Sequence, residues 1–161
     1  MSVIMINRAR TCAFSGHRAV GKDLKTDDLK EIIEKFTENG YDTFLIGMAR
    51  GFDLLCYSVL DEIRKEKPIK IVACIPCENQ DEKFSLKDKQ KYNEAINGVD
   101  DKIYIGREYD NRCMHKRNEF MVDNSSALIV YLKRDFGGTY STIKYAEKNG
   151  VPVLNVLDYN K

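Results

Sequence analysis

The sequence predicts an α/β fold: a three-layer sandwich with a mostly parallel sheet and helices on both faces. Three observations predict it. Short apolar runs alternate with amphipathic stretches about six times along the 161 residues. Most of the runs are continuously apolar, as in strands that are buried on both faces. Regular strand–helix alternation is typical of parallel sheets with right-handed crossovers. We expect one domain over residues 1–161, without repeats or linkers.

Six apolar runs are expected to form the strands, at residues 11–15, 43–46, 69–75, 102–105, 127–132 and 151–157. They are short and rich in β-branched and aromatic residues, which favours strands over helices.

The stretches between the runs are expected to be helices. The first is expected to be capped by Thr26 and to end at Asn39-Gly40. Its apolar side chains follow the i, i+3, i+4, i+7 spacing of one helix face, at Leu29, Ile32, Ile33 and Phe36. Four more helices are expected near residues 55–63, 86–96, 112–122 and 140–148.

Composition and charge exclude several classes of protein. The chain is 43% hydrophobic and 32% charged, with a net charge of +1, so no overall field attracts it to nucleic acid or anionic lipid. No run reaches the roughly 18 apolar residues of a membrane helix. The first residues do not have the pattern of a signal peptide. We therefore expect a cytoplasmic protein without a membrane partner.

The five cysteines are expected to be reduced thiols, because they are odd in number and no export signal is present. Cys74 and Cys77 form a C-x-x-C pair. A structural zinc site needs four ligands, and the chain has no second pair, so no metal site is expected. A redox pair usually opens a helix, whereas this one closes an expected strand.

Glycines, hydroxyls and cations follow three of the expected strands. In parallel α/β sheets, ligands bind beyond the carboxyl ends of the strands. Glycine lets the backbone approach a ligand, helix N-termini favour anions, and arginine adds forked donors. The sequence therefore predicts a site for a ligand that carries a phosphate or another small anion. Its candidate residues are Ser15, Gly16, His17, Arg18, Gly47, Arg50, Gly51, Asp53, Gly137, Gly138 and Thr139.

Each of these residues also has a structural interpretation. Glycines often serve only as turns, Arg50 can be a surface cation, and Thr139 can cap a helix. His17 can satisfy a loop as well as line a site. Asp53 would repel phosphate, so its expected ligand role is to accept hydrogen bonds from sugar hydroxyls. Tyr140 can stack on a base or pack against the protein.

The motifs resemble those of the SLOG superfamily. The resemblance rests on four segments: Ser-Gly-His-Arg after the first strand, Gly-x-Ala-Arg-Gly-x-Asp after the second, Arg-Asn-x-x-Met-Val-Asp, and Gly-Gly-Thr-x-x-Thr. This superfamily includes the Lonely Guy phosphoribohydrolases, DNA-processing protein A and the small bacterial YpsA-type proteins. The YpsA-type branch is most similar, since it also carries a proline, a glutamine and an aromatic residue as in segment 76–84.

The resemblance implies a Rossmann-like fold and a nucleotide or nucleotide-derived ligand over the strand ends. The first binding loop would hold Gly47, Arg50, Gly51 and Asp53, and the second Gly137, Gly138, Thr139 and Thr142. Segment 114–118 is similar to an active-site segment of the hydrolase branch, which implies a ligand role for Arg117 with Asn118 beside it. A homo-oligomer is also implied. No cofactor is expected beyond the nucleotide ligand.

Two positions depart from the pattern of the superfamily. Met48 replaces a glycine of the first loop, and we expect it to narrow the space for phosphate. Thr142 stands where the hydrolase branch carries a glutamate that assists cleavage of an N-glycosidic bond. Threonine cannot supply that charge. Asp53 or Glu119 would have to substitute, so the catalytic residues are unknown.

Three functions follow from these observations. The leading hypothesis is binding or sensing of a phosphorylated nucleoside derivative. The first alternative is a nucleoside 5′-monophosphate phosphoribohydrolase. The second is association with single-stranded DNA, for which the basic segment 112–118 and Lys133-Arg134 are candidates. A solvated helix face is the favoured explanation of those cations, so nucleic acid is a possible partner but not the favoured one.

Overall fold

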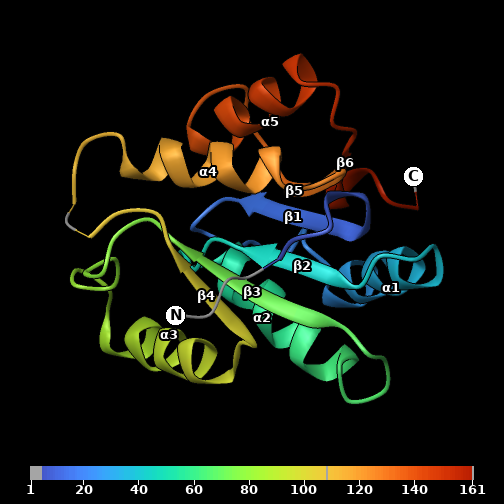
Figure 1. The fold of residues 1–161 in the computed structure, drawn as a ribbon, viewed down its shortest axis with the longest axis horizontal. Coiled ribbons are helices and arrows are strands. Elements are labelled where there is room, and N and C mark those ends of the chain that lie inside the picture. Colours follow the sequence, from blue (N-terminus) through green and yellow to red (C-terminus); the bar gives the residue numbers. More distant parts are fainter. Residues whose placement is uncertain (1–4, 108, 161) are drawn as a thin grey trace.

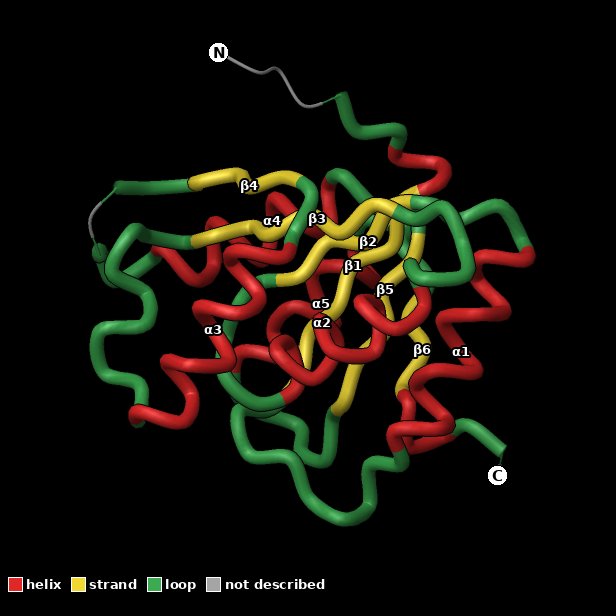
Figure 2. Tube along the Cα trace, turned by 90° about the horizontal axis from the view of Figure 1, so that it is seen from below, coloured by secondary structure: helices red, strands yellow, loops and turns green. Residues whose placement is uncertain are grey.

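The computed structural model describes residues 5–107 and 109–160. In this part of the chain six strands form one sheet: β1 (Thr11–Gly16), β2 (Thr43–Ile46), β3 (Lys70–Ile75), β4 (Asp101–Tyr104), β5 (Ala127–Tyr131) and β6 (Val153–Asn155). The strand order is β4-β3-β2-β1-β5-β6, and every pairing is parallel. Figure 2 shows the strands crossing the molecule from β4 to β6.

Helices cover both faces of the sheet, which confirms the predicted three-layer α/β fold (Figure 1). The helices are α1 (Thr26–Glu38), α2 (Phe52–Ile63), α3 (Leu86–Gly98), α4 (Cys113–Asp123) and α5 (Gly138–Lys148), with short 3-10 turns η1 (Arg8–Arg10) and η2 (Val156–Asp158). The first three pack on one face, and α4 and α5 pack on the other. None of the helices in the described ranges has the length and hydropathy of a membrane-spanning segment.

The central apolar runs are continuous because β1, β2, β3 and β5 each supply both cores, whereas the edge strand β4 alternates and contributes only Ile103, to one of them. Along β1, Phe14 joins the core beneath α1, α2 and α3, while its neighbour Ala13 joins the core beneath α4 and α5. Leu45 and Leu128 lie in the second core with Ala13. Successive side chains of a strand point to opposite faces, so a strand with helices on both sides has no polar face.

The start of α1 differs from expectation. Helix α1 begins at Thr26 itself, with Lys25 in the capping position and no side-chain capping bond, so the expected cap is wrong. The expected end is observed: Asn39 is the C-terminal cap and Gly40 follows at φ +95°.

All five cysteines are free and buried. In the C-x-x-C pair, Cys74 belongs to the core beneath α4 and α5. Burial raises the pKa of the Cys77 thiol, and the neighbouring Cys113 raises it further.

The fold places a crevice between β1 and β5. From β1 the chain runs outward through β2, β3 and β4, then returns through α4 to β5 on the other side of β1. The carboxyl ends of the two central strands are in register, with Gly16 opposite Tyr131. This reversal of strand order is where parallel α/β sheets bind ligands.

Candidate functional site

A cavity of about 510 Å³ lies at the carboxyl ends of β1 and β5, and we call it the glycine-loop cavity. The loops after β1, β2 and β5 and helices α4 and α5 all contribute to it. Its lining is Phe14, Ser15, Gly16, His17, Arg18, Ala19, Ala49, Asp53, Met114, Arg117, Asn118, Lys133, Arg134, Gly138 and Thr139.

The structure brings most of the predicted site residues together. Nine of the fourteen line the glycine-loop cavity: Ser15, Gly16, His17, Arg18, Asp53, Arg117, Asn118, Gly138 and Thr139. Four of the remaining five lie close by: Arg50 lines a neighbouring cavity, Gly47 and Gly51 pack beneath the site, and Gly137 precedes α5. Ligand binding by these residues stays a prediction.

Gly16 and Gly51 are required by contacts within the protein. A Cβ at Gly51 would lie 2.1 Å from the carbonyl oxygen of Arg18, and its φ is +83°. A Cβ at Gly16 would lie 2.4 Å from the ring of Phe52. These glycines therefore let loops pack against one another, rather than bringing backbone to a ligand.

Gly138 differs from them, because a Cβ there would meet nothing within 4 Å. It is the first residue of α5, whose N-terminus has no side-chain cap and no acidic residue in the first turn. Helix N-termini carry unpaired N–H groups and a partial positive charge. Open space and free donors therefore coincide at this wall of the cavity.

A buried carboxylate and a buried guanidinium lie in the floor of the cavity. Asp53 and Arg117 are each 5% exposed. Asp53 Oδ2 accepts a hydrogen bond from the Ala49 N–H at 3.2 Å, while Oδ1 is buried without a partner among the described residues. Burial raises the pKa of Asp53 to about 6, against the opposing effect of the Arg117 charge.

Arg117 holds the loop after β2 to helix α4. Its Nη1 donates to the carbonyl oxygen of Gly47, and its Nε donates to Oδ1 of Asn118 at 2.7 Å. Burial lowers the pKa of Arg117, and the charge of Asp53 opposes this shift. The guanidinium stays charged nonetheless, because arginine is not deprotonated in proteins.

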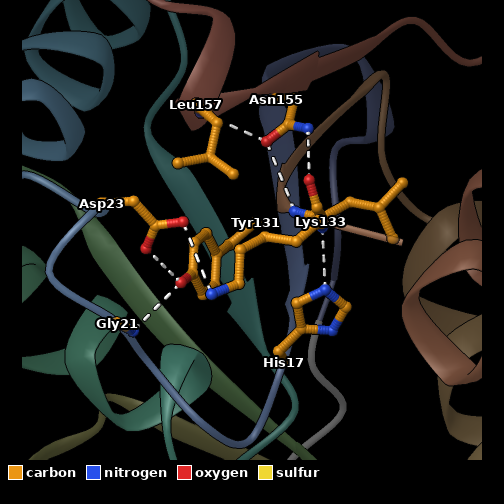
Figure 3. Close-up of polar contacts among 8 residues, drawn as sticks. His17, Gly21, Asp23, Tyr131, Lys133, Asn155 and Leu157 are labelled. Atoms are coloured by element: carbon orange, nitrogen blue, oxygen red, sulfur yellow. Dashed lines mark hydrogen bonds and ion pairs between the residues drawn. The ribbon is translucent and has the colours of Figure 1, made fainter.

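His17 is held as a neutral ring by the backbone after β5 (Figure 3). Its Nε2 accepts a hydrogen bond from the Lys133 N–H at 2.9 Å, so the ring proton lies on Nδ1. Desolvation lowers the pKa of His17, and the positive charges of Arg134 and Lys133 lower it further. The ring also packs edge-on against Tyr131.

Tyr131 fastens the loop after β1 to the end of β5. Its hydroxyl donates to Asp23 Oδ1 at 2.7 Å and accepts from the Gly21 N–H at 3.0 Å (Figure 3). Lys133 forms an ion pair with Asp23 at 3.5 Å and lies over the Tyr131 ring. This network fixes the loop that carries His17 and Arg18.

The two departures from the superfamily pattern have structural outcomes. Met48 has a φ of +64° and its side chain is fully buried in the core, so it does not narrow the cavity and that expectation is wrong. Thr142 does not line the glycine-loop cavity. Its hydroxyl donates to the carbonyl oxygen of Gly138, and its side chain lines a separate cavity of about 190 Å³ with Glu119.

A second cavity of about 560 Å³ adjoins the first, and we call it the aromatic cavity. The two share Arg18, Ala49 and Met114. The rest of its lining is Arg50, Cys77, Asn79, Gln80, Glu82, Lys83, Phe84 and Tyr109. Tyr140, for which both stacking on a base and packing were open, lines neither cavity.

Sequence reasoning assigned no site role to most residues of the aromatic cavity. Gln80 and Phe84 lie in the 76–84 segment that carried part of the resemblance to the YpsA-type branch. That resemblance was the sequence feature that could have indicated a site role for them. Tyr109 follows β4 in a segment without periodicity. Lys133 and Arg134 were noted only as basic residues, although both follow a strand that leads to the glycine pair.

Comparison with known proteins agrees with this architecture. The model of the YspA SLOG family (YpsA) matches residues 12–155. The uncharacterized SPbeta prophage-derived protein YoqJ of Bacillus subtilis is 29% identical over 140 residues, covering 79% of this chain and 80% of YoqJ. UPF0398 protein OB1025 of Oceanobacillus iheyensis is 26% identical over 144 residues, covering 83% and 78%.

Two solved structures share the fold. DNA processing protein A from Streptococcus pneumoniae superposes with a TM-score of 0.67 at 17% identity, covering 91% of this chain and 50% of that one. The Helicobacter pylori protein of the same name gives a TM-score of 0.64 at 15% identity, covering 90% and 64%. This chain therefore spans about half to two thirds of those proteins.

Proposed function

Because this chain belongs to the YpsA branch of the SLOG family, we propose that it binds the phosphate-bearing part of a nucleotide or nucleotide-derived ligand in the glycine-loop cavity. One observation carries the proposal: in the part of the chain that the structure describes, Arg18, Arg117, Lys133 and Arg134 line this cavity with a single carboxylate, that of Asp53. The whole chain has a net charge of only +1, so the excess of cations is local.

Backbone and side-chain donors support an anion at this place. The uncapped N-terminus of α5 offers N–H groups beside Gly138. His17 has a proton on Nδ1, because its Nε2 is already an acceptor. These donors and the forked guanidinium of Arg18 suit the oxygens of a phosphate group.

Asp53 suits the sugar of such a ligand. A carboxylate repels phosphate, but the unpartnered Oδ1 can accept a hydrogen bond from a ribose hydroxyl. A buried acceptor without a donor is unfavourable, so a ligand hydroxyl there would remove that penalty. We therefore place the ribose beside Asp53 and the phosphate toward α5.

Calorimetry tests the proposal with inorganic phosphate, ribose 5-phosphate and a series of nucleotides. Arg18→Ala and Arg134→Ala should each weaken binding of ribose 5-phosphate about tenfold, since each removes a charge-assisted hydrogen bond. Both side chains are exposed, so the variants should fold. Arg8→Ala, in η1 at the amino end of β1, is the matched control. Absence of binding across the whole series would reject the proposal.

Hydrolysis of the N-glycosidic bond is the alternative enzymatic function. Among the described residues, Asp53 is the only carboxylate that lines the glycine-loop cavity, whereas Glu119 lies in the separate cavity with Thr142. If Asp53 takes the role of the missing glutamate, purified protein should release base from AMP, and Asp53→Asn should abolish the release. No base above the Asp53→Asn background would leave binding as the function.

Association with single-stranded DNA is a second candidate. The Helicobacter pylori protein that shares the fold is described with a single-stranded DNA binding mode. Here exposed cations and an exposed ring, that of Tyr109, adjoin one another across the two cavities, a combination that also suits a single strand.

Fluorescence anisotropy with a labelled oligothymidine separates strand binding from mononucleotide binding. A strand that contacts several cations should lose affinity steeply with salt, and Lys133→Ala and Arg134→Ala should each reduce the salt slope by about 0.7. No anisotropy change at low salt would reject this candidate.

We further propose that the protein is cytoplasmic and bacterial and forms a homo-oligomer. The relatives in Bacillus subtilis and Oceanobacillus iheyensis support the bacterial source, and the five free thiols fit a reducing compartment. Light scattering tests the assembly, and a monomer at every micromolar concentration would contradict it.

A further inference from the structure

The aromatic cavity differs from its neighbour in chemistry. Phe84, Tyr109, Met114 and Cys77 give it an apolar surface, and Gln80 stands among them. Its volume of about 560 Å³ lies within the range of small-molecule sites, which are mostly apolar with few polar groups. The two cavities share Arg18, Ala49 and Met114, so one ligand can extend from the first cavity into the second.

The two rings of the cavity are held differently. Phe84 is half-buried, and its ring packs edge-on against Tyr92, with centroids 5.8 Å apart and an interplanar angle of 87°. That contact fixes the orientation of the Phe84 ring. Tyr109 is 65% exposed, which is unusual for so large an apolar surface. An exposed ring beside a cavity offers a face for stacking.

Gln80 supplies the second observation that points to a ligand. Its side chain is 8% exposed, and its Nε2 donates to the Gly47 carbonyl oxygen at 3.0 Å. A carbonyl only accepts, so this contact fixes which end of the amide is Oε1. That Oε1 is buried without a hydrogen-bond partner among the described residues. The cavity is thus lined by a residue with an unused acceptor.

We infer that the aromatic cavity binds the heterocyclic base of a nucleotide whose phosphate occupies the glycine-loop cavity. The inference rests on the proposed function and adds the class of ligand. The base stacks against Tyr109, with Phe84 as the fixed apolar wall. Gln80 Oε1 accepts from a ring or exocyclic N–H of the base, so bases that carry such donors are preferred.

Paired ligands and paired variants test the inference by calorimetry. AMP carries a base and ribose 5-phosphate does not, so AMP should bind the native protein at least about tenfold more tightly. Stacking of one base contributes roughly 1–3 kcal/mol, which corresponds to about 5- to 150-fold in affinity. Tyr109→Ala should therefore weaken AMP binding at least fivefold and leave ribose 5-phosphate binding unchanged. Phe84→Leu, which keeps an apolar side chain, should weaken AMP binding less.

Tyr104→Ala is the matched control, because Tyr104 is a half-exposed tyrosine on β4 that lines neither cavity. It should change neither affinity. If AMP and ribose 5-phosphate bind equally and Tyr109→Ala has no effect on either, the base site is rejected and the anion site stands. If neither ligand nor any other nucleotide binds, the proposed function fails and the base site fails with it.

Discussion

Asp53 and Arg117 both lie against Gly47: a Cβ added to this glycine would be 2.9 Å from Asp53 Oδ2 and 2.7 Å from Arg117 Nη1. No ion pair within 4.0 Å joins the two side chains in the described structure. Each charge affects the pKa of the other across the space that a side chain at position 47 would fill. The floor of the site therefore depends on a glycine at this position.

Asp53 should give the protein a stability that falls as pH rises. Its folded-state pKa of about 6 is above the ordinary value of 3.8, so the native state binds this proton more tightly than the unfolded state does. The free energy of unfolding should decrease between about pH 4 and pH 6, by up to about 3 kcal/mol, and level off above. Urea denaturation of native protein and Asp53→Asn across this range measures the difference.

Asp23→Asn is the control for this pH dependence. The Tyr131 hydroxyl lowers the pKa of Asp23, so its contribution to stability is present above the ordinary pKa and is lost only toward lower pH. Between pH 4 and pH 6 this variant should keep the native slope. An equal slope in native protein and Asp53→Asn would show that Asp53 titrates normally.

Gly51→Ala should destabilise the protein by at least about 3 kcal/mol. The added methyl group meets a backbone carbonyl at 2.1 Å, and the left-handed φ adds its own strain. Gly150→Ala is the matched control, since φ there is +74° but the space is open, and it should cost about 1 kcal/mol. Thermal and urea unfolding measure both, and similar losses would mean that contact with Arg18 is unimportant.

His17 should be neutral at pH 7 and carry its proton on Nδ1. Nitrogen-15 NMR distinguishes the tautomers, and His115→Gln assigns the signals, because the chain has two histidines. The measured pKa should be below 6.5, and addition of ribose 5-phosphate should raise it, since a nearby anion stabilises the charged ring. A proton on Nε2 would contradict the hydrogen bond from Lys133.

Met48→Gly should destabilise the protein by about 2 kcal/mol despite relieving backbone strain. A positive φ costs a residue with a Cβ about 1 kcal/mol, whereas losing a fully buried methionine side chain costs 2–5 kcal/mol. Met48→Leu keeps both the strain and most of the volume and should cost less than about 1.5 kcal/mol. A Met48→Gly protein as stable as the native one would show that strain outweighs burial.

The fold could be predicted because its signal is local. Continuous apolar runs between amphipathic stretches gave all six strands within about two residues at most ends, and strand–helix alternation gave the layers. The last strand is shorter than the predicted 151–157. Asn155 accepts a hydrogen bond from the Leu157 N–H and starts the turn η2 there. A capping bond of this kind is not visible in hydrophobic periodicity.

The candidate site could be predicted only in part, because loop–loop contacts are tertiary. The rule that ligands bind at the carboxyl ends of strands located the glycine-loop cavity. It could not show that the space beside Gly16 is filled by the Phe52 ring and the space beside Gly51 by the Arg18 backbone. The aromatic cavity takes Gln80 and Tyr109 from irregular segments, where sequence spacing carries no information about which side chains meet.

The peptide between Gly47 and Met48 has an unfavourable backbone conformation, and side chains of Arg117 and Gln80 hold it there. Rotation of this peptide plane changes ψ of Gly47 and φ of Met48 together, so turning it over would let Met48 leave its positive φ. The same rotation would withdraw the Gly47 oxygen from both Arg117 and Gln80. Arg117 on α4 and Gln80 after β3 therefore both hold the Gly47–Met48 peptide in the orientation that goes with the positive φ of Met48.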